Sequence, residues 1–403
     1  MRSAGAYDVA VVGAGILGLA TARRLLAGRP GLRLAVLERE PEPAAHQTGH
    51  NSGVVHSGVY YAPGSLKARL CVAGKEALER YVAERGLALE RCGKVIVALE
   101  EAELPRLAEL ERRARANGVP GLRVLGPEEL REVEPNAAGI RALHAPGTAI
   151  VDYRQVAAAL AEDVRAAGGE LLLGTAVAGL AEGARSVALE TTRGALEAGA
   201  VVACAGLQSD RVAALSGVRP PVRIVPFRGD YYTLRPRARE LVRGLLYPVP
   251  DPAFPFLGVH FTRTVDGRVI AGPNAVLALA RERYGRAGVS LRDVASTLGY
   301  PGFWRFARRH LRFGAGELYR DLSRRAYVRE LRRYLPALGE DDVEFGPSGI
   351  RAQALAPDGK LVDDIVLERR GRVLHVLNAP SPAATASLAI AEHLAGEAAA
   401  LLA

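Results

Sequence analysis

The sequence has little cysteine, with only Cys71, Cys92 and Cys204 among 403 residues. They are scattered and form no C-x-x-C pair, which argues against a disulfide framework or a cysteine-based zinc site and favours a reducing compartment. No apolar run is long enough to cross a bilayer, since the most apolar early stretch, residues 9–22, is interrupted by three glycines. Residues 1–6 lack the apolar segment of a signal peptide. We therefore expect a cytoplasmic protein, or one peripheral to the inner face of a membrane.

Lysine is nearly absent as well. Removing the four lysines from the 53 basic residues leaves 49 arginines, and the formal net charge is +9. Such a basic excess can serve nucleic acid, anionic lipid or anionic substrates. Because the sequence contains no RNA-binding motif, we predict no nucleic-acid partner and interpret most of the arginines as a solvated surface.

Apolar residues, in contrast, make up 49% of the chain, which is enough for a large buried core. The length of 403 residues suits two domains, or one large domain with an insertion. The sequence offers neither a low-complexity linker nor an internal repeat that would mark a boundary. Domain limits therefore have to be inferred from motifs.

A dinucleotide-binding pattern opens the chain. YDVAVV, residues 7–12, is a β-branched apolar run that predicts a buried strand, and it leads into GAGILG, residues 13–18. A helical pattern then ends at Gly28, and a second strand over residues 32–37 ends in Glu38. Strand, G-x-G-x-x-G, helix, strand and acid together predict binding of an adenine dinucleotide.

Each part of this pattern has a physical reason. Gly13 permits a tight turn, Gly15 leaves room for a pyrophosphate, and Gly18 lets helix and strand pack closely. The helix N-terminus presents free N–H groups and a positive dipole end to the phosphates. Glu38 is placed to accept hydrogen bonds from a ribose hydroxyl, which disfavours NADP. The pattern alone does not separate FAD from NAD.

Residues 46–61, HQTGHNSGVVHSGVYY, gather small, hydrogen-bonding and titratable side chains in one stretch. Three of the eight histidines lie here: His46, His50 and His56. Glycines let the backbone approach a cofactor, and Asn51 and Ser52 suit phosphate or ribityl groups. A metal site is the alternative, but the spacings of four and six come with no H-E-x-x-H and no nearby cysteine, so we expect no metal.

This stretch and several later blocks resemble one known family. The blocks are HQTGHNSGVVHSGVYYAPGSLKARLCVAGKEAL (46–78), FRGDYYTL (227–234), LGVHFTRTVDGRVIAGPNAV (257–276), SGIRAQAL (348–355) and HVLNAPSPAATASLAI (375–390). They resemble the L-2-hydroxyglutarate oxidases and dehydrogenases, which belong to the D-amino-acid-oxidase-like flavoproteins. The resemblance covers essentially the whole chain. It implies FAD as cofactor and oxidation of L-2-hydroxyglutarate to 2-oxoglutarate by hydride transfer from Cα to flavin N5.

The resemblance also implies a fold. We expect an α/β protein with a Rossmann-like, D-amino-acid-oxidase-like FAD-binding domain and a discontinuous α+β substrate domain that carries a mixed or antiparallel sheet. The FAD domain would comprise residues 1–90, 145–215 and 341–403. The substrate domain would comprise residues 91–144 and 216–340.

From the pattern and the resemblance together we expect a set of FAD contacts. Residues 201–206, VVACAG, resemble a return strand of the cofactor domain, and residues 378–384, NAPSPAA, precede a helix whose free N–H groups suit the flavin O2 edge. The expected contacts are Gly13, Gly15, Ile16, Leu17, Gly18, Glu38, Arg39, Thr48, His50, Asn51, Ser52, Gly53, Val177, Ala205, Gly206, Gly349, Ser381, Pro382, Ala383 and Ala384.

Oxidising a 2-hydroxy acid requires a base for the hydroxyl proton and cations for the carboxylates. A base that titrates near neutrality points to histidine, so His260 and His56 are the candidates, with His260 preferred. In amino-acid-oxidising relatives an arginine in a triplet similar to residues 349–351 holds the substrate carboxylate, which suggests Arg351. For the second carboxylate of a diacid, Arg228, Tyr231 and Lys67 stay open.

Residues 276–340 are helix-rich and dense in arginine, and YPGFWRFARRHLRF (300–313) mixes arginines with aromatics. This composition suits contact with anionic lipid. The simpler interpretation, which we prefer, is a cap helix whose aromatics pack on the substrate domain while its arginines face water.

Rival interpretations stay open at this point. A related FAD enzyme acting on an amino acid or on glycerol 3-phosphate is the nearest, and a non-enzymatic nucleotide- or RNA-binding protein is remote. Oxygen, a quinone and an electron-transfer protein are all open as electron acceptor.

Overall fold

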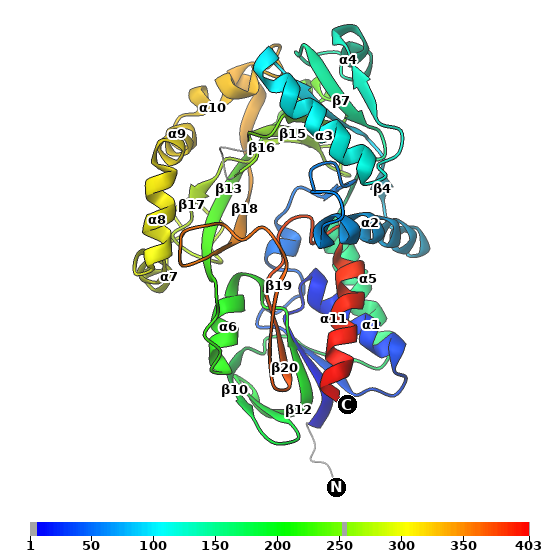
Figure 1. The fold of residues 1–403 in the computed structure, drawn as a ribbon, viewed down its shortest axis with the longest axis vertical. Helices are drawn as coiled ribbons and strands as arrows, with labels where there is room; N and C mark the ends of the chain where they lie inside the picture. The colour runs from blue at the N-terminus through cyan, green and yellow to red at the C-terminus, as the bar shows by residue number, and fades with distance from the viewer. Residues whose placement is uncertain (1–5, 252–255, 403) are drawn as a thin grey trace.

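The computed structural model describes residues 6–251 and 256–402. Its two large sheets, of eight and nine strands, lie in the lower and upper halves of Figure 1 and are flanked by helices. A third sheet consists of three short strands: Val54–Val55 (β3), Leu89–Glu90 (β4) and Ala149–Val151 (β8).

The eight-stranded sheet has the order β10-β11-β12-β1-β2-β9, and β20 and β19 join it beside β12. Its strands are Ala6–Val12 (β1), Leu34–Leu37 (β2), Glu170–Leu172 (β9), Val177–Glu182 (β10), Val187–Thr191 (β11), Gly194–Ala203 (β12), Val366–Arg370 (β19) and Val373–Asn378 (β20). The central strands β20, β12, β1, β2 and β9 run parallel. This is the predicted Rossmann-like sheet, although the strand expected over 201–206 begins earlier, at Gly194, and ends at Ala203.

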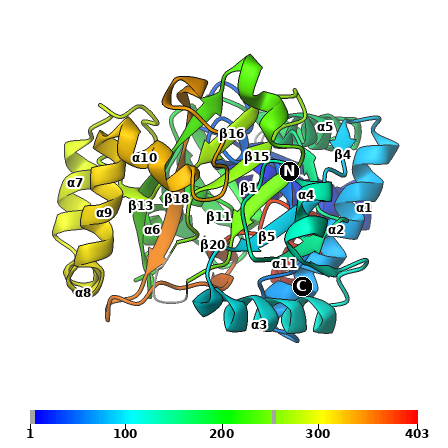
Figure 2. The same ribbon diagram turned by 90° about the horizontal axis from the view of Figure 1, so that it is seen from above.

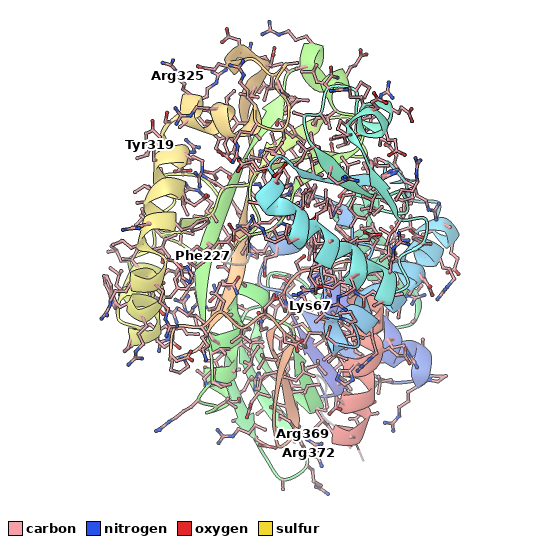
Figure 3. The ribbon with its side chains drawn as sticks, turned by 45° about the horizontal axis from the view of Figure 1, so that its top comes forward. Lys67, Phe227, Tyr319, Arg325, Arg369 and Arg372 are labelled. Atoms are coloured by element: carbon pink, nitrogen blue, oxygen red, sulfur yellow. The ribbon has the colours of Figure 1, made fainter. Side chains whose placement is uncertain are left out.

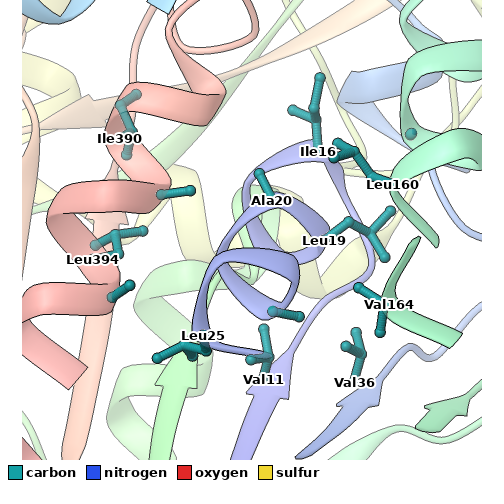
Figure 4. Packing of buried hydrophobic residues seen from close by; sticks show 14 of the residues in the cluster. Val11, Ile16, Leu19, Ala20, Leu25, Val36, Leu160, Val164, Ile390 and Leu394 are labelled. Atoms are coloured by element: carbon teal, nitrogen blue, oxygen red, sulfur yellow. The ribbon is translucent and has the colours of Figure 1, made fainter. Parts of the chain in front are cut away.

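Alternating residues of β1 bury opposite faces of this sheet. Val9 and Val11 face the helices Ile16–Gly28 (α1), Tyr153–Ala166 (α5) and Ser387–Leu402 (α11), whereas Ala10 and Val12 face the β10–β11 hairpin and Ser209–Leu215 (α6). Figure 4 shows Val11 and Val36 beneath α1, between α5 and α11. Burial on both faces explains why β1 reads as a continuous apolar run.

The nine-stranded sheet has the order β17-β13-β16-β15-β14-β5-β7-β6, and β18 pairs with β13. Its strands are Lys94–Ala98 (β5), Arg123–Leu125 (β6), Arg141–Ala145 (β7), Arg223–Leu234 (β13), Leu245–Pro248 (β14), His260–Arg263 (β15), Val269–Gly272 (β16), Val276–Leu277 (β17) and Val343–Leu355 (β18). Pairing is antiparallel except between β14 and β5. The second sheet is therefore mixed, as the resemblance implied.

Helices cover the outer faces of this second sheet. They are Leu104–Ala116 (α3), Pro127–Val133 (α4), Leu291–Leu298 (α7), Pro301–Arg309 (α8), Leu311–Leu322 (α9) and Arg324–Leu331 (α10). Helix Leu66–Glu84 (α2) instead packs against α11, in the core of the eight-stranded sheet. In the view from above, α7, α8 and α9 form an outer layer at one side (Figure 2). The stretch 300–313 is thus not one helix, because α8 ends at Arg309 and α9 begins at Leu311.

The division into an FAD domain and a substrate domain stays a proposal. The eight-stranded sheet draws on segments assigned to the FAD domain, and the nine-stranded sheet draws mainly on those assigned to the substrate domain. Strand β18 lies inside 341–403 but pairs with β13, so by sheet membership it goes with the substrate side. Residues 1–5, 252–255 and 403, which the expected boundaries include, lie outside the described residues. No helix of the described chain is long and apolar enough to cross a membrane.

The close approach of α1 to the preceding turn gives a stability prediction. A Cβ on Gly18 would lie 1.9 Å from the carbonyl oxygen of Gly13, so Gly18→Ala should lower the free energy of unfolding by ~1–3 kcal/mol or more. Gly396→Ala in α11 is the control, because a Cβ there meets nothing within 4 Å and alanine should stabilise the helix by ~0.5–1 kcal/mol. Urea unfolding followed by circular dichroism measures both; equal midpoints would refute the steric explanation.

Candidate active site

The glycine-rich turn lies where β1, β2 and β12 end. Gly13 has a φ of 104° and a Cβ there would lie 2.5 Å from the carbonyl oxygen of Cys204, so the turn requires glycine on both counts. The carboxylate of Glu38 accepts hydrogen bonds from the backbone N–H of Ala14 at 2.8 Å and of Glu40 at 3.0 Å. The acid thus stands at the turn, as the pattern predicted, and it also fixes the backbone of the turn.

The segment 46–61 begins against the N-terminus of α1. The hydroxyl of Thr48 accepts a hydrogen bond from the N–H of Ile16 at 3.0 Å. The side chain of Asn51 donates to the carbonyl of Thr48 at 2.7 Å and accepts from the N–H of Gly53 at 2.8 Å. Asn51 therefore holds the loop in shape, a contribution that sequence analysis did not foresee beside its expected phosphate contact.

Two of the three histidines tie this segment to distant parts of the chain. The ring of His50 stacks on Tyr284 with centroids 3.7 Å apart, and its Nδ1 lies 3.1 Å from the carbonyl oxygen of Ser348. His46 has its Nδ1 3.3 Å from the hydroxyl of Tyr284, and its Nε2 lies 3.0 Å from a carboxylate oxygen of Glu40. Arg39, an expected FAD contact, forms ion pairs at 2.8 Å with Glu40 and with Glu282. Burial lowers the pKa of His50.

Other expected cofactor residues lie around the same turn. Ala205 and Gly206 follow β12, and a Cβ on Gly206 would lie 3.0 Å from the side chain of Gln47. Val177 begins β10, two residues after Thr175, whose N–H donates to the carbonyl of Glu38 at 2.7 Å. Gly349 packs against His50, since a Cβ there would lie 2.5 Å from the carbonyl oxygen of His50. The chain thus brings these segments together.

The turn between β20 and α11 meets the far end of segment 46–61. Ser381, Pro382, Ala383 and Ala384 form this turn, and the helix starts at Ser387 rather than at the expected residue 385. Thr385 has its hydroxyl 3.1 Å from the N–H of His56, which donates to it, and 3.0 Å from the hydroxyl of Tyr153. Residues 381–386 therefore hold His56 in position.

His56 and His260 lie in one buried cluster. His260 is in β15, where its ring stacks on Tyr247 with centroids 3.9 Å apart and its Nδ1 lies 2.9 Å from the carbonyl oxygen of Gly258. Burial, with a smaller effect from Lys94, lowers the pKa of His260 to about 3 and that of His56 well below its usual value. Within the described residues, Nδ1 of His56 has no hydrogen-bond partner. Both rings are thus neutral before an anion binds.

Lys94 is a candidate functional residue that sequence analysis missed. It starts β5, is 2% exposed, and has its ammonium 4.1 Å from the ring centroid of Tyr247 and 5.3 Å from that of Tyr60. Burial lowers its pKa to about 7, and no described carboxylate pairs with it. The signal was present in the sequence: one of only four lysines opens the otherwise apolar run KVIVA.

Arg351 and Tyr231 lie on adjacent strands. Arg351 is in β18, with its guanidinium 5.3 Å from the ring centroid of Phe256 and 3.4 Å from the carbonyl oxygen of Asn274, to which it donates. The charge of Arg351 partly offsets burial, which raises the pKa of Tyr231 in β13. The charge of Arg351 also lowers the pKa of His260, beside the larger effect of burial, so these candidates from three strands of the nine-stranded sheet influence one another.

Two candidates for the distal carboxylate are already engaged. Arg228 is buried and donates to Asp230 at 3.0 Å and to Asp321 at 3.2 Å, so it neutralises acids inside the fold. Lys67, the second residue of α2, forms an ion pair with Asp363 at 2.6 Å and lies over the ring of Tyr61; it is labelled in Figure 3. Of the open candidates, Tyr231 alone accompanies Arg351. No group of three or more histidine, cysteine or acidic residues arranged to hold a metal occurs in residues 6–251 and 256–402.

Comparison with known proteins adds the family. The model of the FAD-dependent oxidoreductases matches residues 8–397. The chain belongs to this family. It is 48% identical to L-2-hydroxyglutarate dehydrogenase, mitochondrial, of Nematostella vectensis over 98% of this chain and 90% of that protein. Identity is 44% to L-2-hydroxyglutarate dehydrogenase of Escherichia coli K12, with coverage of 98% and 94%, and 45% to the human mitochondrial enzyme, with coverage of 98% and 89%.

Solved structures support the fold of this FAD-dependent oxidoreductase. L-α-glycerophosphate oxidase of Mycoplasma pneumoniae with FAD bound superimposes with a TM-score of 0.79 at 21% identity, covering 98% of this chain and 94% of that one. Glycine oxidase of Geobacillus kaustophilus gives a TM-score of 0.71 at 22% identity, covering 99% and 95%. The expected α/β fold with a second mixed sheet is thereby confirmed.

The residues present fit the FAD that the family uses. The space beside Gly15 is free for a cofactor, because a Cβ built there would have only the hydroxyl of Thr48 within 4 Å, at 3.4 Å. Glu38 retains lone pairs for a ribose hydroxyl beyond its two backbone bonds. Further along segment 46–61, Nδ1 of His56 is buried and has no hydrogen-bond partner in the described chain. A polar group of a bound molecule would satisfy it.

Glu38 provides a test of the nucleotide end. Glu38→Ala removes the acceptor of two backbone N–H groups as well as the ribose acceptor, so FAD affinity should fall ~10–100-fold. Glu42→Ala, an exposed acid nearby, is the control and should leave affinity unchanged. Titration of the deflavinated protein with FAD, read by flavin fluorescence, measures both; equal affinities would place the ribose elsewhere.

Proposed function

We propose that this protein oxidises L-2-hydroxyglutarate to 2-oxoglutarate with FAD. The family and the curated relatives at 44–48% identity over nearly the whole chain support the reaction. The observation that carries the proposal in the structure is a buried cluster around the ring of Tyr247. His260 stacks on this ring with centroids 3.9 Å apart, and the ammonium of Lys94 lies 4.1 Å from its centroid. The charges of Lys94 and Arg351 both act on His260. Two cations and a base are what a hydroxy diacid needs.

His260 is the proposed base. Because its Nδ1 lies 2.9 Å from the carbonyl oxygen of Gly258, that nitrogen carries the proton and donates it to the carbonyl. The lone pair of Nε2 is then left to accept the hydroxyl proton of the substrate. His56, whose Nδ1 lacks a partner in the described chain, is the alternative base.

Arg351 is the proposed partner of the carboxylate beside the reacting carbon, with Tyr231 as a hydroxyl donor next to it. Lys94 is the proposed partner of the distal carboxylate, since its buried ammonium has no acidic neighbour in the described chain. Each buried cation is energetically costly while it has no anionic partner. Because the protein has already removed both cations from water, a dianion that pairs with both binds more tightly. A monoacid would leave Lys94 unpaired.

Substrate binding also prepares the base. In the free protein burial is the main cause of the low pKa of His260, and the charges of Lys94 and Arg351 lower it further. Two carboxylates next to those cations would offset the effect of the charges, raise the pKa of His260 and make it a stronger base. When bound, FAD supplies the acceptor for the hydride that leaves Cα.

The remaining FAD contacts named from the sequence are proposed as the cofactor site. The electron acceptor that reoxidises the enzyme is proposed as oxygen, a quinone or an electron-transfer protein, which anaerobic mixing with each would distinguish. We propose a cytoplasmic enzyme with peripheral membrane contact; its three cysteines are free thiols, which suits a reducing compartment.

The decisive experiment is an anaerobic visible spectrum of the purified protein before and after addition of L-2-hydroxyglutarate, with the D-isomer as control. Flavin absorbance should bleach with the L-isomer alone. Bleaching by neither isomer would refute the substrate, and amino acids and glycerol 3-phosphate would be tried next.

Exchange of the two histidines tests the base. His260→Asn removes the free Nε2 and should lower kcat by ~10²–10⁴-fold while flavin binding persists. His56→Asn should have a smaller effect. Stopped-flow flavin reduction gives both rates, and a larger loss in H56N would reassign the base to His56.

Lys94 gives a prediction with a defined pH dependence. Its pKa of about 7 in the free enzyme means that the charged form, which pairs with the distal carboxylate, is lost as pH rises. In a profile from about pH 6 to about pH 9, kcat/KM for the diacid should therefore begin to fall near pH ~7. At the alkaline end the fall should approach tenfold per pH unit.

Two variants separate charge from packing. Lys94→Met should lower kcat/KM for L-2-hydroxyglutarate by ~10–100-fold and change that for L-2-hydroxybutyrate little. Lys94→Arg, which stays charged, should abolish the alkaline fall. A fall that persists in K94R, or an equal loss on both substrates in K94M, would assign the distal carboxylate to another residue.

A further inference from the structure

Helix α9 has its polarity reversed. Its buried residues are Glu317 and Asp321. Glu317 accepts from the backbone N–H of Ala275 at 2.7 Å, and Asp321 accepts from Asn274 at 2.7 Å and from Arg228. A surface helix of a globular protein normally buries its apolar stripe and exposes its charges. Here the acids face the protein.

The leucines of α9 consequently face outwards. Leu311, Leu318 and Leu322 recur at helical spacing on one face and are 70%, 53% and 77% exposed, and Tyr319 lies beside them. Figure 3 shows Tyr319 on the outside of the helix layer, near Arg325. The expectation that the aromatics of residues 300–313 pack inwards holds for Phe303 and Phe306 of α8 but fails for Trp304, which is 53% exposed.

The neighbouring helices extend this surface. Leu291 and Leu298 of α7 and Trp304 of α8 are exposed as well, and α7, α8 and α9 lie in one outer layer in Figure 2. We call the exposed residues of these three helices the α7–α9 face. Apolar patches of this kind on a surface mark contacts with partners or membranes.

The charge on the α7–α9 face has a single sign. The exposed charged residues of 291–322 are Arg292, Arg305, Arg308, Arg309 and Arg312. The acids of the same segment are all buried, and each is bonded to an arginine: Asp293 to Arg211, Glu317 to Arg320, and Asp321 to Arg228. Segment 291–322 therefore exposes leucines, one tryptophan, one tyrosine and arginines, and none of its own carboxylates; the exposed Asp358, which precedes Gly359 beside α8, is an acid close to Arg309.

We propose that the α7–α9 face docks on the surface of a bilayer that contains anionic lipid. Leucines would enter the acyl boundary, Trp304 and Tyr319 would lie at the headgroup level, and arginines would pair with anionic headgroups. A second copy of the chain fits poorly, because it would bring the five exposed arginines of segment 291–322 against the same five arginines. The inference deepens the proposed peripheral contact by assigning its surface.

The single tryptophan of the chain makes the face observable in the holoenzyme. Trp304 is 53% exposed and belongs to the α7–α9 face. Vesicles of phosphatidylcholine with roughly one-third phosphatidylglycerol should shift its emission to the blue, and brominated acyl chains should quench it. Phosphatidylcholine vesicles alone should do neither, and raised salt should weaken binding.

Substitution then tests the assignment by co-sedimentation with the same vesicles. The double variant Leu318→Ser and Leu322→Ser should lower the binding constant by roughly tenfold or more, since both side chains are exposed and leave the core intact. Leu215→Ser, an exposed leucine of α6, is the matched control and should bind as the unmodified protein does.

Reduction of a water-soluble dye by L-2-hydroxyglutarate, measured on each preparation, separates this inference from the proposed function. Normal turnover without binding to anionic vesicles, or binding that the double variant retains, would overturn the α7–α9 face alone. Dimers in light scattering that vanish in the double variant would overturn it in favour of self-association. Vesicle binding without turnover would overturn the proposed substrate and leave the face assigned.

Discussion

Hydrogen bonds from one short segment, residues 46–61, connect the cofactor turn to the substrate sheet. Thr48 binds the start of α1, His50 binds the backbone of β18, and the N–H of His56 binds Thr385 before α11. These partners lie 32, 298 and 329 residues away in the sequence. Because one segment is bonded to all three, a shift of one sheet relative to the other would break at least one of these hydrogen bonds.

This connection explains why so many polar residues occur together in 46–61. The backbone of a loop inside the protein must find partners for its N–H and carbonyl groups. Thr48 and Asn51 provide them at one end, and the buried Tyr153 and Thr385 meet the loop at the other. The ring of His50 binds the carbonyl of Ser348 in β18, whereas Nδ1 of His56 has no hydrogen-bond partner in the described chain.

The proposed site contains a buried cation, Lys94, for which the described chain provides no counter-ion. Lys94 is buried between aromatic rings, and burial brings its pKa to about 7. Leaving a cation in this state costs stability that a hydrophobic residue would not cost. This cost favours one class of ligand, because a ligand with a carboxylate next to Lys94 offsets it and a ligand without one does not. Burial is thus the main cause of both lowered pKa values, that of Lys94 and that of His260.

Local patterns allowed the cofactor half to be predicted. Gly13, Gly18 and Glu38 follow from steric and hydrogen-bonding needs within forty consecutive residues, and the structure has them at one turn. The substrate half depends on strand pairing. Lys94 faces Tyr247 because β5 pairs with β14, and Tyr247 faces His260 because β14 pairs with β15. No local spacing encodes that register, so Lys94 was missed and Arg228 was considered a candidate for the distal carboxylate.

The polarity of α9 was missed for a related reason. Helical periodicity shows that a stripe is apolar, but the neighbouring sheet decides which stripe is buried. The sheet beneath α9 carries Arg228 on β13 and Arg351 on β18, on paired strands. Asp321 neutralises Arg228, and the charge of Glu317 favours the charged form of Arg351. Once these acids face inwards, the geometry of a helix places Leu318 and Leu322 outside. The orientation that brings Glu317 near Arg351, the proposed partner of the substrate carboxylate, therefore also exposes the apolar face of α9.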